Sequence, residues 1–208
     1  MFKVILADPP WTFRVRSPKG TGRSASNHYS LMTIEDIIGL GPKVQAVADK
    51  DAVLFLWACN SQLPEALATM EAWGFDYVSL LTWVKMTKDN SRPAIGLGYR
   101  FRGVTEQLMF GVRKGGRTYS PPPAQRKPGI IMSPRREHSK KPDEQWPYIE
   151  CYPGPYLEMF SRERREGWTC LGNEIGEKLD IRESLPKILL PKRRKCLIEP
   201  SKNNTDVV

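Results

Sequence analysis

Short apolar segments recur along the first half of the chain, separated by segments of helical or polar pattern. Phe2 to Ala7 is an apolar run with β-branched members that ends at Asp8-Pro9-Pro10, and it predicts a buried strand opening into a rigid turn. The wholly apolar run Ala52 to Trp57 predicts a second strand, and Tyr77 to Val84 predicts a third.

Two helices are predicted between these strands. Thr33, with Asp36 three residues on, resembles an N-terminal cap for a short helix through about Leu40. Ser61 is expected to cap a longer helix that Gly74 ends. The alternation of strand, helix and strand indicates an α/β fold with a parallel sheet, in which function concentrates at the carboxyl ends of the strands.

The second half of the chain contains two long segments rich in Gly, Pro and Arg. Residues 86–105 and 114–136 bracket one strand at about Glu106 to Val112, and connections of this length inside a domain are usually functional or disordered. The remaining predicted elements are a helix from about Lys141 to Cys151, strands at Tyr156 to Phe160 and around Trp168 to Leu171, a helix from Asn173 to Ile188, and a basic tail from Pro191.

Length and composition fit one folded domain. The chain has 208 residues, 40% of them hydrophobic and 26% charged, which is enough for a sizeable core and typical of globular proteins. No apolar run approaches the roughly 18 residues of a membrane span, and the first apolar run is too short for a signal peptide. Four cysteines without a C-x-x-C pair predict neither a zinc module nor a disulfide framework. We therefore expect a soluble, unexported protein.

The positive charge is concentrated in the middle of the chain. The formal net charge is +9, and the segment Lys85 to Lys141 holds 14 Lys and Arg residues against 3 acidic residues. Such a basic section is the electrostatic footprint expected for a polyphosphate partner such as nucleic acid. A solvated basic surface that only aids solubility is the alternative.

The candidate chemistry lies at Asp8-Pro9-Pro10-Trp11, where the first predicted strand ends. Two consecutive prolines remove two amide donors and leave carbonyl oxygens and a carboxylate as acceptors beside an indole ring. Acceptors that take both protons of a base's exocyclic amine can direct the nitrogen lone pair at an electrophile, while an aromatic ring stacks on the base. The alternative is an ordinary strand exit with Trp11 packed in the core.

These residues are the first of a series that resembles the MT-A70 family of adenine-N6 methyltransferases, in order, over roughly residues 2–176. The tetrad Asp8 to Trp11 matches the family's catalytic motif. The further matching segments are His28 to Met32, Leu54 to Trp57, Thr82 to Lys85, Glu106 to Arg113, Arg135 to Glu144, Leu157 to Arg162, Gly167-Trp168 and Leu171 to Glu174.

The resemblance implies a Rossmann-like class I methyltransferase fold. In that fold a mostly parallel sheet has helices on both faces, and here the catalytic motif would be N-terminal to the cofactor-binding motif. It also implies a single methyltransferase domain over residues 1–176 with basic substrate-binding loops at 86–105 and 114–136. Residues 177–208 would form a C-terminal helix and a basic tail.

The resemblance further implies S-adenosyl-L-methionine as cofactor. A metal-dependent nuclease or hydrolase is discounted, and no metal is expected, because His28 and His138 are the only histidines and lie far apart in sequence. The catalytic residues would be Asp8, Pro9, Pro10 and Trp11; the substrate-binding residues Tyr29, Lys85, Arg100, Arg102 and Glu106; and the cofactor-binding residues Asp8, Ser139, Lys141, Phe160, Arg162, Asn173 and Glu174. Trp11 or Tyr29 would stack on the target base. Lys141 is expected to be a mobile cation suited to the cofactor's carboxylate.

The predicted reaction is in-line attack of an adenine N6 on the sulfonium methyl group, giving N6-methyladenine and S-adenosylhomocysteine. We expect a site-specific DNA adenine-N6 methyltransferase of bacterial or phage type, acting in the cytoplasm on a base flipped out of the duplex. The same methylation of RNA is the first alternative. A non-catalytic nucleic-acid-binding subunit is the second, and the intact tetrad argues against it. We expect no membrane contact, and the oligomeric state stays open between monomer and homodimer.

Overall fold

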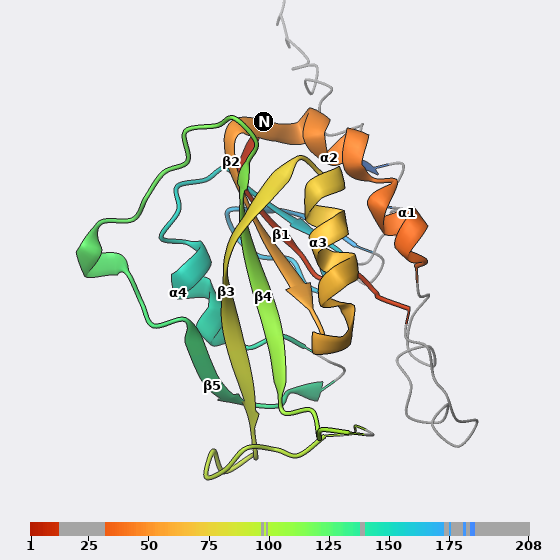
Figure 1. Cartoon of the computed structure of the whole chain (residues 1–208). Helices are drawn as coiled ribbons and strands as arrows, with labels where there is room; N and C mark the ends of the chain where they lie inside the picture. The colour runs from red at the N-terminus through yellow and green to blue at the C-terminus, as the bar shows by residue number, and fades with distance from the viewer. Residues whose placement is uncertain are drawn as a thin grey trace, which may run out of the picture.

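The structure, a computed structural model, describes residues 1–12, 32–96, 98, 100–137, 140–172, 175, 181, 184 and 185. In this part of the chain, seven strands form one sheet in the order β5-β3-β4-β2-β1-β6-β7 (Figure 1). The strands are β1 (Phe2–Ala7), β2 (Ala48–Ala58), β3 (Phe75–Met86), β4 (Thr105–Arg113), β5 (Ile130–Pro134), β6 (Tyr156–Met159) and β7 (Trp168–Leu171).

The sheet is parallel except at β4. Strand β1 is parallel to β2 and β6, β3 is parallel to β5, and β6 is parallel to β7. Strand β4 runs antiparallel between β2 and β3. The prediction of a mostly parallel, Rossmann-like α/β sheet is therefore confirmed.

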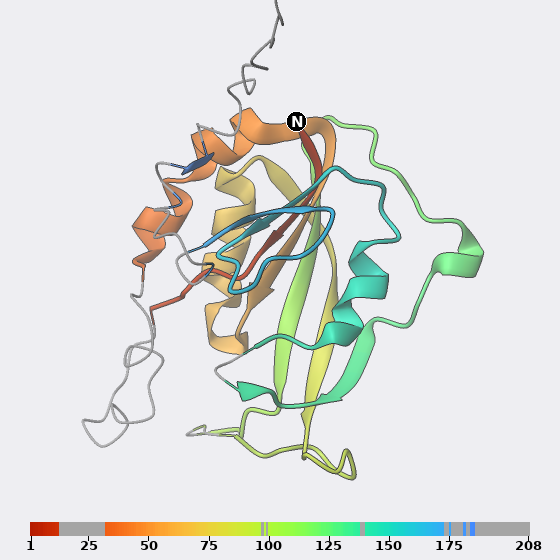
Figure 2. The same cartoon turned by 180° about the vertical axis from the view of Figure 1, so that it is seen from behind.

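Helices cover both faces of the sheet (Figures 1 and 2). On one side lie α1 (Ile34–Ile38), α2 (Gly41–Val47) and α3 (Leu63–Ala72), the last preceded by the 3-10 turn η3 (Asn60–Gln62). On the other side lies α4 (Trp146–Ile149), preceded by the 3-10 turn η6 (Asp143–Gln145). A further 3-10 turn, η4 (Pro123–Gln125), lies in the connection between β4 and β5. Among the described residues, no helix has the length and apolar character needed to cross a membrane.

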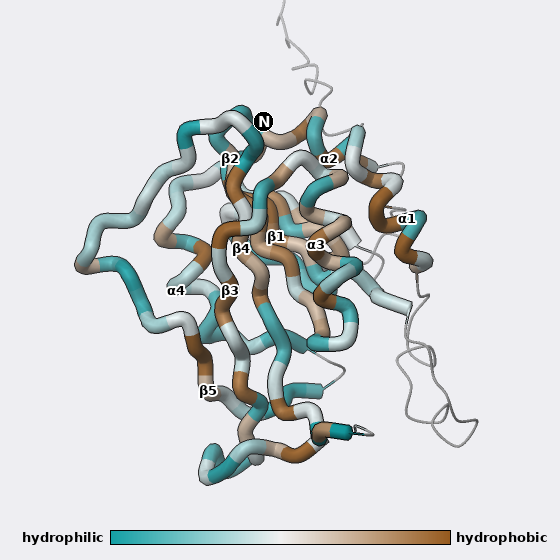
Figure 3. Tube along the Cα trace, in the orientation of Figure 1, coloured by the Kyte–Doolittle hydropathy of each residue, from teal (hydrophilic) through white to brown (hydrophobic). Residues whose placement is uncertain are grey.

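Alternate residues of the central strands pack into two different cores. Ile5 of β1 and Leu54 of β2 belong to the cluster that includes α1 to α3. Leu6 and Phe55 belong to a second cluster, which includes Ile149 of α4. Because successive strand side chains point to opposite faces, a strand covered on both faces must be apolar throughout. Figure 3 shows this apolar centre against hydrophilic connections.

Local sequence signals fixed some of the element ends. The Thr33 hydroxyl accepts a hydrogen bond from the Asp36 amide at 3.1 Å, and Gly74 ends α3 with a φ of +82°, both as predicted. The prediction that Ser61 caps a helix is wrong. The α-helix begins only at Leu63, after η3, and the Ser61 hydroxyl instead donates to the side chain of Gln62.

Two elements were not predicted. Helix α2 starts with Gly41-Pro42, which are strong breakers inside a helix but are tolerated in its first turn. Strand β5 lies within the predicted 114–136 loop, and as an edge strand it leaves Ile130 and Met132 about half exposed. The predicted helix 173–188 lies mostly outside the described residues, although Ile181 and Leu185 are buried in the same cluster as α1 to α3. The predicted basic tail from Pro191 also lies outside them.

Gly172, directly after β7, has no space for a side chain. A Cβ there would lie 1.9 Å from the backbone oxygen of Ser161. We expect Gly172→Ala to lower the free energy of unfolding by about 1–3 kcal/mol, because the main chain must shift to admit the methyl group. Urea denaturation measures this change. An unaltered unfolding midpoint would contradict the close approach.

The matched control is Gly129→Ala. A Cβ at Gly129 meets only the Leu80 carbonyl oxygen, at an ordinary 3.4 Å. Its free energy of unfolding should stay within about 0.5 kcal/mol of the wild type.

Candidate active site

A pocket lies where the chain leaves the parallel strands β1 and β6. Ala7 of β1 is paired with Met159 of β6, so the residues that follow each strand meet at the same edge of the sheet. The lining residues are Leu6, Asp8, Trp57, Lys140, Lys141, Asp143, Gln145, Trp146, Glu158, Phe160, Arg162, Glu163, Arg164 and Arg165. Four predicted cofactor-binding residues, Asp8, Lys141, Phe160 and Arg162, are thus brought together.

Lys141 places a positive charge in a largely buried position. Its Nζ lies 2.9 Å from Asp8 Oδ1 and 3.2 Å from Glu106 Oε2, and its side chain is only 13% exposed. Burial alone would lower the pKa of Lys141, but the charges of Asp8 and Glu106 outweigh it and raise this pKa above its ordinary value. The expectation of a mobile cation is therefore wrong here, because two carboxylates hold the ammonium group in place.

Glu106 joins this pair to Lys85. It lies at the start of β4, is 6% exposed, and forms an ion pair with Lys85 on the neighbouring strand β3. Burial alone would raise the pKa of Glu106, but the ammonium groups of Lys141 and Lys85 hold it below its ordinary value. Lys85 and Glu106, both predicted to bind substrate, therefore belong to one charge cluster, Lys85-Glu106-Lys141-Asp8.

The Asp8-Pro9-Pro10-Trp11 turn is held by hydrogen bonds. The Trp11 amide donates to the Pro9 carbonyl at 2.8 Å, and the Met32 amide donates to the Pro10 carbonyl at 3.0 Å. Each carbonyl oxygen has a second lone pair, so the hydrogen bond that it accepts does not use its full acceptor capacity.

Trp11 lies in the core. Its side chain is 5% exposed, and its indole Nε1 donates to the Trp57 carbonyl at 2.9 Å. A buried indole needs one partner for its N–H, and the end of β2 supplies it. The structure therefore does not support stacking of Trp11 on a base, and the core-packing alternative holds. Tyr29, the other predicted stacking residue, lies outside the described residues.

Trp57, at the end of β2, connects the two halves of the site. Besides accepting from Trp11, it donates from its own Nε1 to Gln145 Oε1 at 2.9 Å. Its ring centre lies 5.4 Å from Lys141 Nζ, within the range of a cation–π contact. The sequence showed Trp57 as part of a family-like strand end, whereas nothing in its pattern indicated a role for Gln145.

Strand β6 and the residue that follows it contribute two unusual side chains. Burial raises the pKa of Glu158 to about 7, although a hydrogen bond with Ser161 partly opposes this shift. Phe160 has a φ of +63°, a left-handed conformation that is rare for a bulky residue. Such strain concentrates at functional sites. Glu158 was not predicted as a site residue, although it lies in the family-like segment Leu157 to Arg162 and is a carboxylate within the otherwise mostly apolar strand Tyr156 to Met159.

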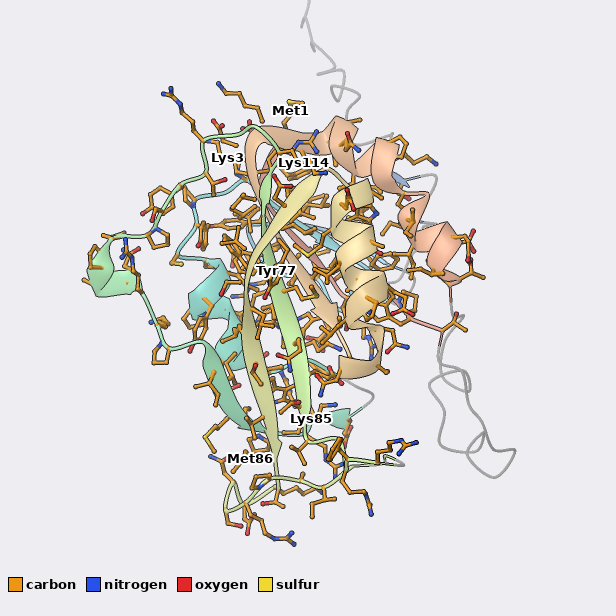
Figure 4. The ribbon with its side chains drawn as sticks, in the orientation of Figure 1. Met1, Lys3, Tyr77, Lys85, Met86 and Lys114 are labelled. Carbon is orange, nitrogen blue, oxygen red and sulfur yellow. The ribbon has the colours of Figure 1, made fainter. Side chains whose placement is uncertain are left out.

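The predicted arginines of the substrate loop lie apart from the pocket. Arg100 and Arg102 are exposed on the connection from β3 to β4, which starts beyond Met86 at the lower end of β3 in Figure 4. Lys114, which begins the other predicted loop, lies with Lys3 near the opposite ends of the strands, at the top of Figure 4. The remaining predicted cofactor residues, Ser139, Asn173 and Glu174, lie outside the described residues.

The pocket suits a ligand with both signs of charge and a planar ring. It is lined by five basic and four acidic side chains together with aromatic rings from Trp57, Trp146 and Phe160. S-adenosylmethionine has a carboxylate, an ammonium group, a sulfonium and an adenine, so the residues present fit it. Within the described ranges, no group of three or more His, Cys, Asp or Glu side chains forms a metal site.

A mostly parallel sheet with such a pocket across the carboxyl ends of its central strands defines a Rossmann-like α/β protein of the methyltransferase class. Residues 2–174 match the MT-A70 family, and the chain belongs to that family. MT-A70 methyltransferases use S-adenosylmethionine as methyl donor.

Three relatives illustrate the range of the family. The chain is 26% identical over 204 residues to the type II methyltransferase M.MunI of a Mycoplasma species, covering 86% of this chain and 81% of the relative. It is 29% identical over 181 residues to a probable N(6)-adenosine-methyltransferase MT-A70-like protein of rice, and the match covers 84% of this chain and 23% of the relative. It is 34% identical over 115 residues to the N6-adenosine-methyltransferase non-catalytic subunit MTB of Arabidopsis thaliana, and the match covers 54% of this chain and 14% of the relative. The chain thus spans less than a quarter of each plant relative.

The raised pKa of Glu158 predicts a pH-dependent stability. In the folded protein this pKa is about 7, against an ordinary 4.5, so the folded state binds more protons than the unfolded state between these values. The contribution of Glu158 to stability is therefore fully present below pH 4.5 and is lost as the pH rises through 7. The side chain in Glu158→Gln cannot ionise. The free energy of unfolding of this variant, relative to that of the wild type, should therefore increase as the pH rises from 5 to about 8.

Urea denaturation of both proteins across this range measures the difference, and comparing them cancels the other titrating groups. A stability difference that does not change with pH would show that Glu158 ionises normally.

Proposed function

We propose that this chain is an S-adenosylmethionine-dependent methyltransferase that methylates the N6 amine of adenine in DNA. The observation that carries the proposal is the position of Asp8. Asp8 is followed directly by Pro9 and Pro10, whose carbonyl oxygens each accept one main-chain hydrogen bond, and it lines the pocket that contains Lys141, Phe160 and Arg162. One carboxylate thus borders both an acceptor site for an amine and a pocket for a zwitterion.

The residues divide between the two reactants. When bound, S-adenosylmethionine supplies an activated methyl group on its sulfonium. Lys141 and Arg162 offer positive charge to its carboxylate, and Phe160 offers an apolar surface. Asp8 and a proline carbonyl accept the two N–H bonds of the target amine and orient its lone pair. Orientation of two bound reactants can supply roughly 7–11 kcal/mol of the barrier. Ser139, Asn173 and Glu174 stay proposed cofactor contacts on the family resemblance alone.

Two comparisons bear on the substrate. Of the relatives described above, the type II methyltransferase is the one whose length the chain covers most fully, which favours a compact enzyme of that type acting on DNA. The name of the rice relative gives adenosine, a ribonucleoside, as its target, so RNA is the second candidate. The non-catalytic Arabidopsis relative makes a purely binding role the third, but the acceptor geometry around Asp8 favours catalysis.

Asp8→Asn should reduce methyl transfer at least about 100-fold, because the neutral amide loses the charge that accepts from the developing ammonium at N6. Radiolabelled cofactor is offered with unmethylated duplex DNA, single-stranded DNA and RNA. Filter binding should show unchanged nucleic-acid affinity. The matched control is Asp76→Asn, an exposed carboxylate on β3, which should keep full activity.

Each result has a clear meaning. If the wild type transferred no methyl group to any of the three substrates, the proposed methyltransferase activity would be refuted. Transfer to RNA alone would show that RNA is the substrate. If Asp8→Asn kept its activity, Asp8 would have no essential role in the reaction.

Arg100 and Arg102 are proposed to contact the DNA backbone. The double variant Arg100→Ala, Arg102→Ala should weaken binding and make the slope of log affinity against log salt shallower by about 1.8, since two phosphate contacts are lost. The control is Lys3→Ala with Lys114→Ala, which removes the same charge near the opposite ends of the strands (Figure 4). Fluorescence anisotropy at several salt concentrations measures both slopes. Equal slopes in the two double variants would remove the arginines from the interface.

A further inference from the structure

The connection from β3 to β4 has two parts, both at the bottom of Figure 1: a turn over residues 87–92, closed by a hydrogen bond from Thr87 N to Arg92 O at 2.9 Å, and a hairpin between Ala94 and Val104. The hairpin is joined to β3 by hydrogen bonds from Lys85 N to Val104 O at 2.8 Å and from Ala94 N to Lys85 O at 2.7 Å, and a bond from Gly96 N to Gly103 O at 2.9 Å crosses it. Near the tip, Arg102 Nε donates to the Gly96 carbonyl at 2.7 Å. Hydrogen bonds therefore hold the two sides of the hairpin together as far as Gly96 and Gly103, close to its tip.

The tip depends on close main-chain contacts. A Cβ at Gly98 would lie 1.9 Å from the Phe101 carbonyl oxygen, and a Cβ at Gly96 would lie 2.5 Å from the Gly103 carbonyl oxygen. Only glycine fits at either position, so the two sides of the hairpin can approach closely. The backbone on which Phe101 is carried is thus fixed by its neighbours.

Phe101 places an aromatic ring in solvent at this tip. It is 91% exposed, the most exposed of the described large hydrophobic side chains. Leaving a phenyl ring in water forgoes the free energy of its burial. Its neighbours in sequence, Arg100 and Arg102, are both exposed as well. An apolar ring flanked in sequence by two arginines combines a surface for base stacking with charges for the adjacent phosphates.

The hairpin is connected directly to the catalytic pocket. Lys85 and Glu106 form its base and are ion-paired, and Glu106 contacts Lys141, which in turn contacts Asp8. Phe101 and Glu106 are five residues apart in the chain, so their backbones are at most about 17 Å apart. The ring is therefore held within a few base-pair steps of the charge cluster.

We propose that Phe101 is a wedge that enters the base stack of duplex DNA and occupies the gap left when the target adenine turns out toward Asp8. This inference rests on the proposed function and adds to it the means by which a paired adenine is reached. An enzyme that acts on a base inside a duplex must unstack that base, and inserted apolar side chains compensate the lost stacking. An adenine in a single strand needs no such help, so the wedge matters only for duplex DNA.

The test compares methyl transfer into unmethylated linear plasmid DNA, as duplex and after denaturation to single strands. Phe101→Ala should lower the rate on duplex DNA about tenfold or more and leave the rate on single strands within about twofold. Phe101→Trp should retain the duplex rate, because an indole also stacks. Ile95→Ala, on the same hairpin and 57% exposed, is the matched control for loss of apolar surface and should not change either rate.

An unchanged duplex rate for Phe101→Ala overturns the wedge, as does a wild type that methylates only single strands. An equal loss on both forms of DNA also overturns it, and together with altered sedimentation it would assign Phe101 to a protein contact. Absence of transfer by the wild type would refute the proposed function itself. Transfer by the wild type with an unaffected Phe101→Ala would refute this inference alone.

Discussion

The site depends on one constraint, the compensation of a buried ammonium group. Lys141 is 13% exposed, and its charge is balanced by Asp8 and Glu106 above the ring of Trp57. These four residues come from four separate segments: the end of β1, the end of β2, the start of β4 and the approach to η6. Removing either carboxylate would leave a poorly compensated buried charge, which typically costs several kcal/mol. The charge therefore fixes the relative positions of the Asp8–Trp11 turn and the pocket beside it.

The same charges determine which kind of ligand the site can bind. Asp8 and Glu106 with Lys85 and Lys141 form a cluster of two negative and two positive groups, so it is neutral before any ligand binds. A zwitterion can exchange partners with such a cluster without adding net charge to a buried site. This favours a ligand that brings both signs together, and two members of the cluster, Asp8 and Lys141, line the pocket.

The sequence predicted the parts of the molecule that local pattern determines. Strands β1 and β2 were located because burial on both faces demands uninterrupted apolar runs, and Thr33 and Gly74 marked ends through their own chemistry. Strand β5 was missed because its edge position permits exposed residues. Local pattern could not show that Lys141 is held by Asp8, because their contact depends on the sheet order. Trp11 illustrates the same limit, since an indole after a strand fits a stacking site or a core equally well. The pKa of Glu158 is likewise a property of its surroundings.

The single antiparallel strand has a consequence beyond packing. Because β4 returns directly beside β3, residues 87–104 form one continuous stretch of chain that leaves the sheet after Met86 and rejoins it at Thr105. The surface proposed to face the nucleic acid therefore comes from a different stretch of chain than the pocket at the ends of β1 and β6. Insertions or exchanges between residues 87 and 104 can alter which polymer is gripped while the sheet order stays the same. The fold thus allows substrate preference to diversify independently of the reaction.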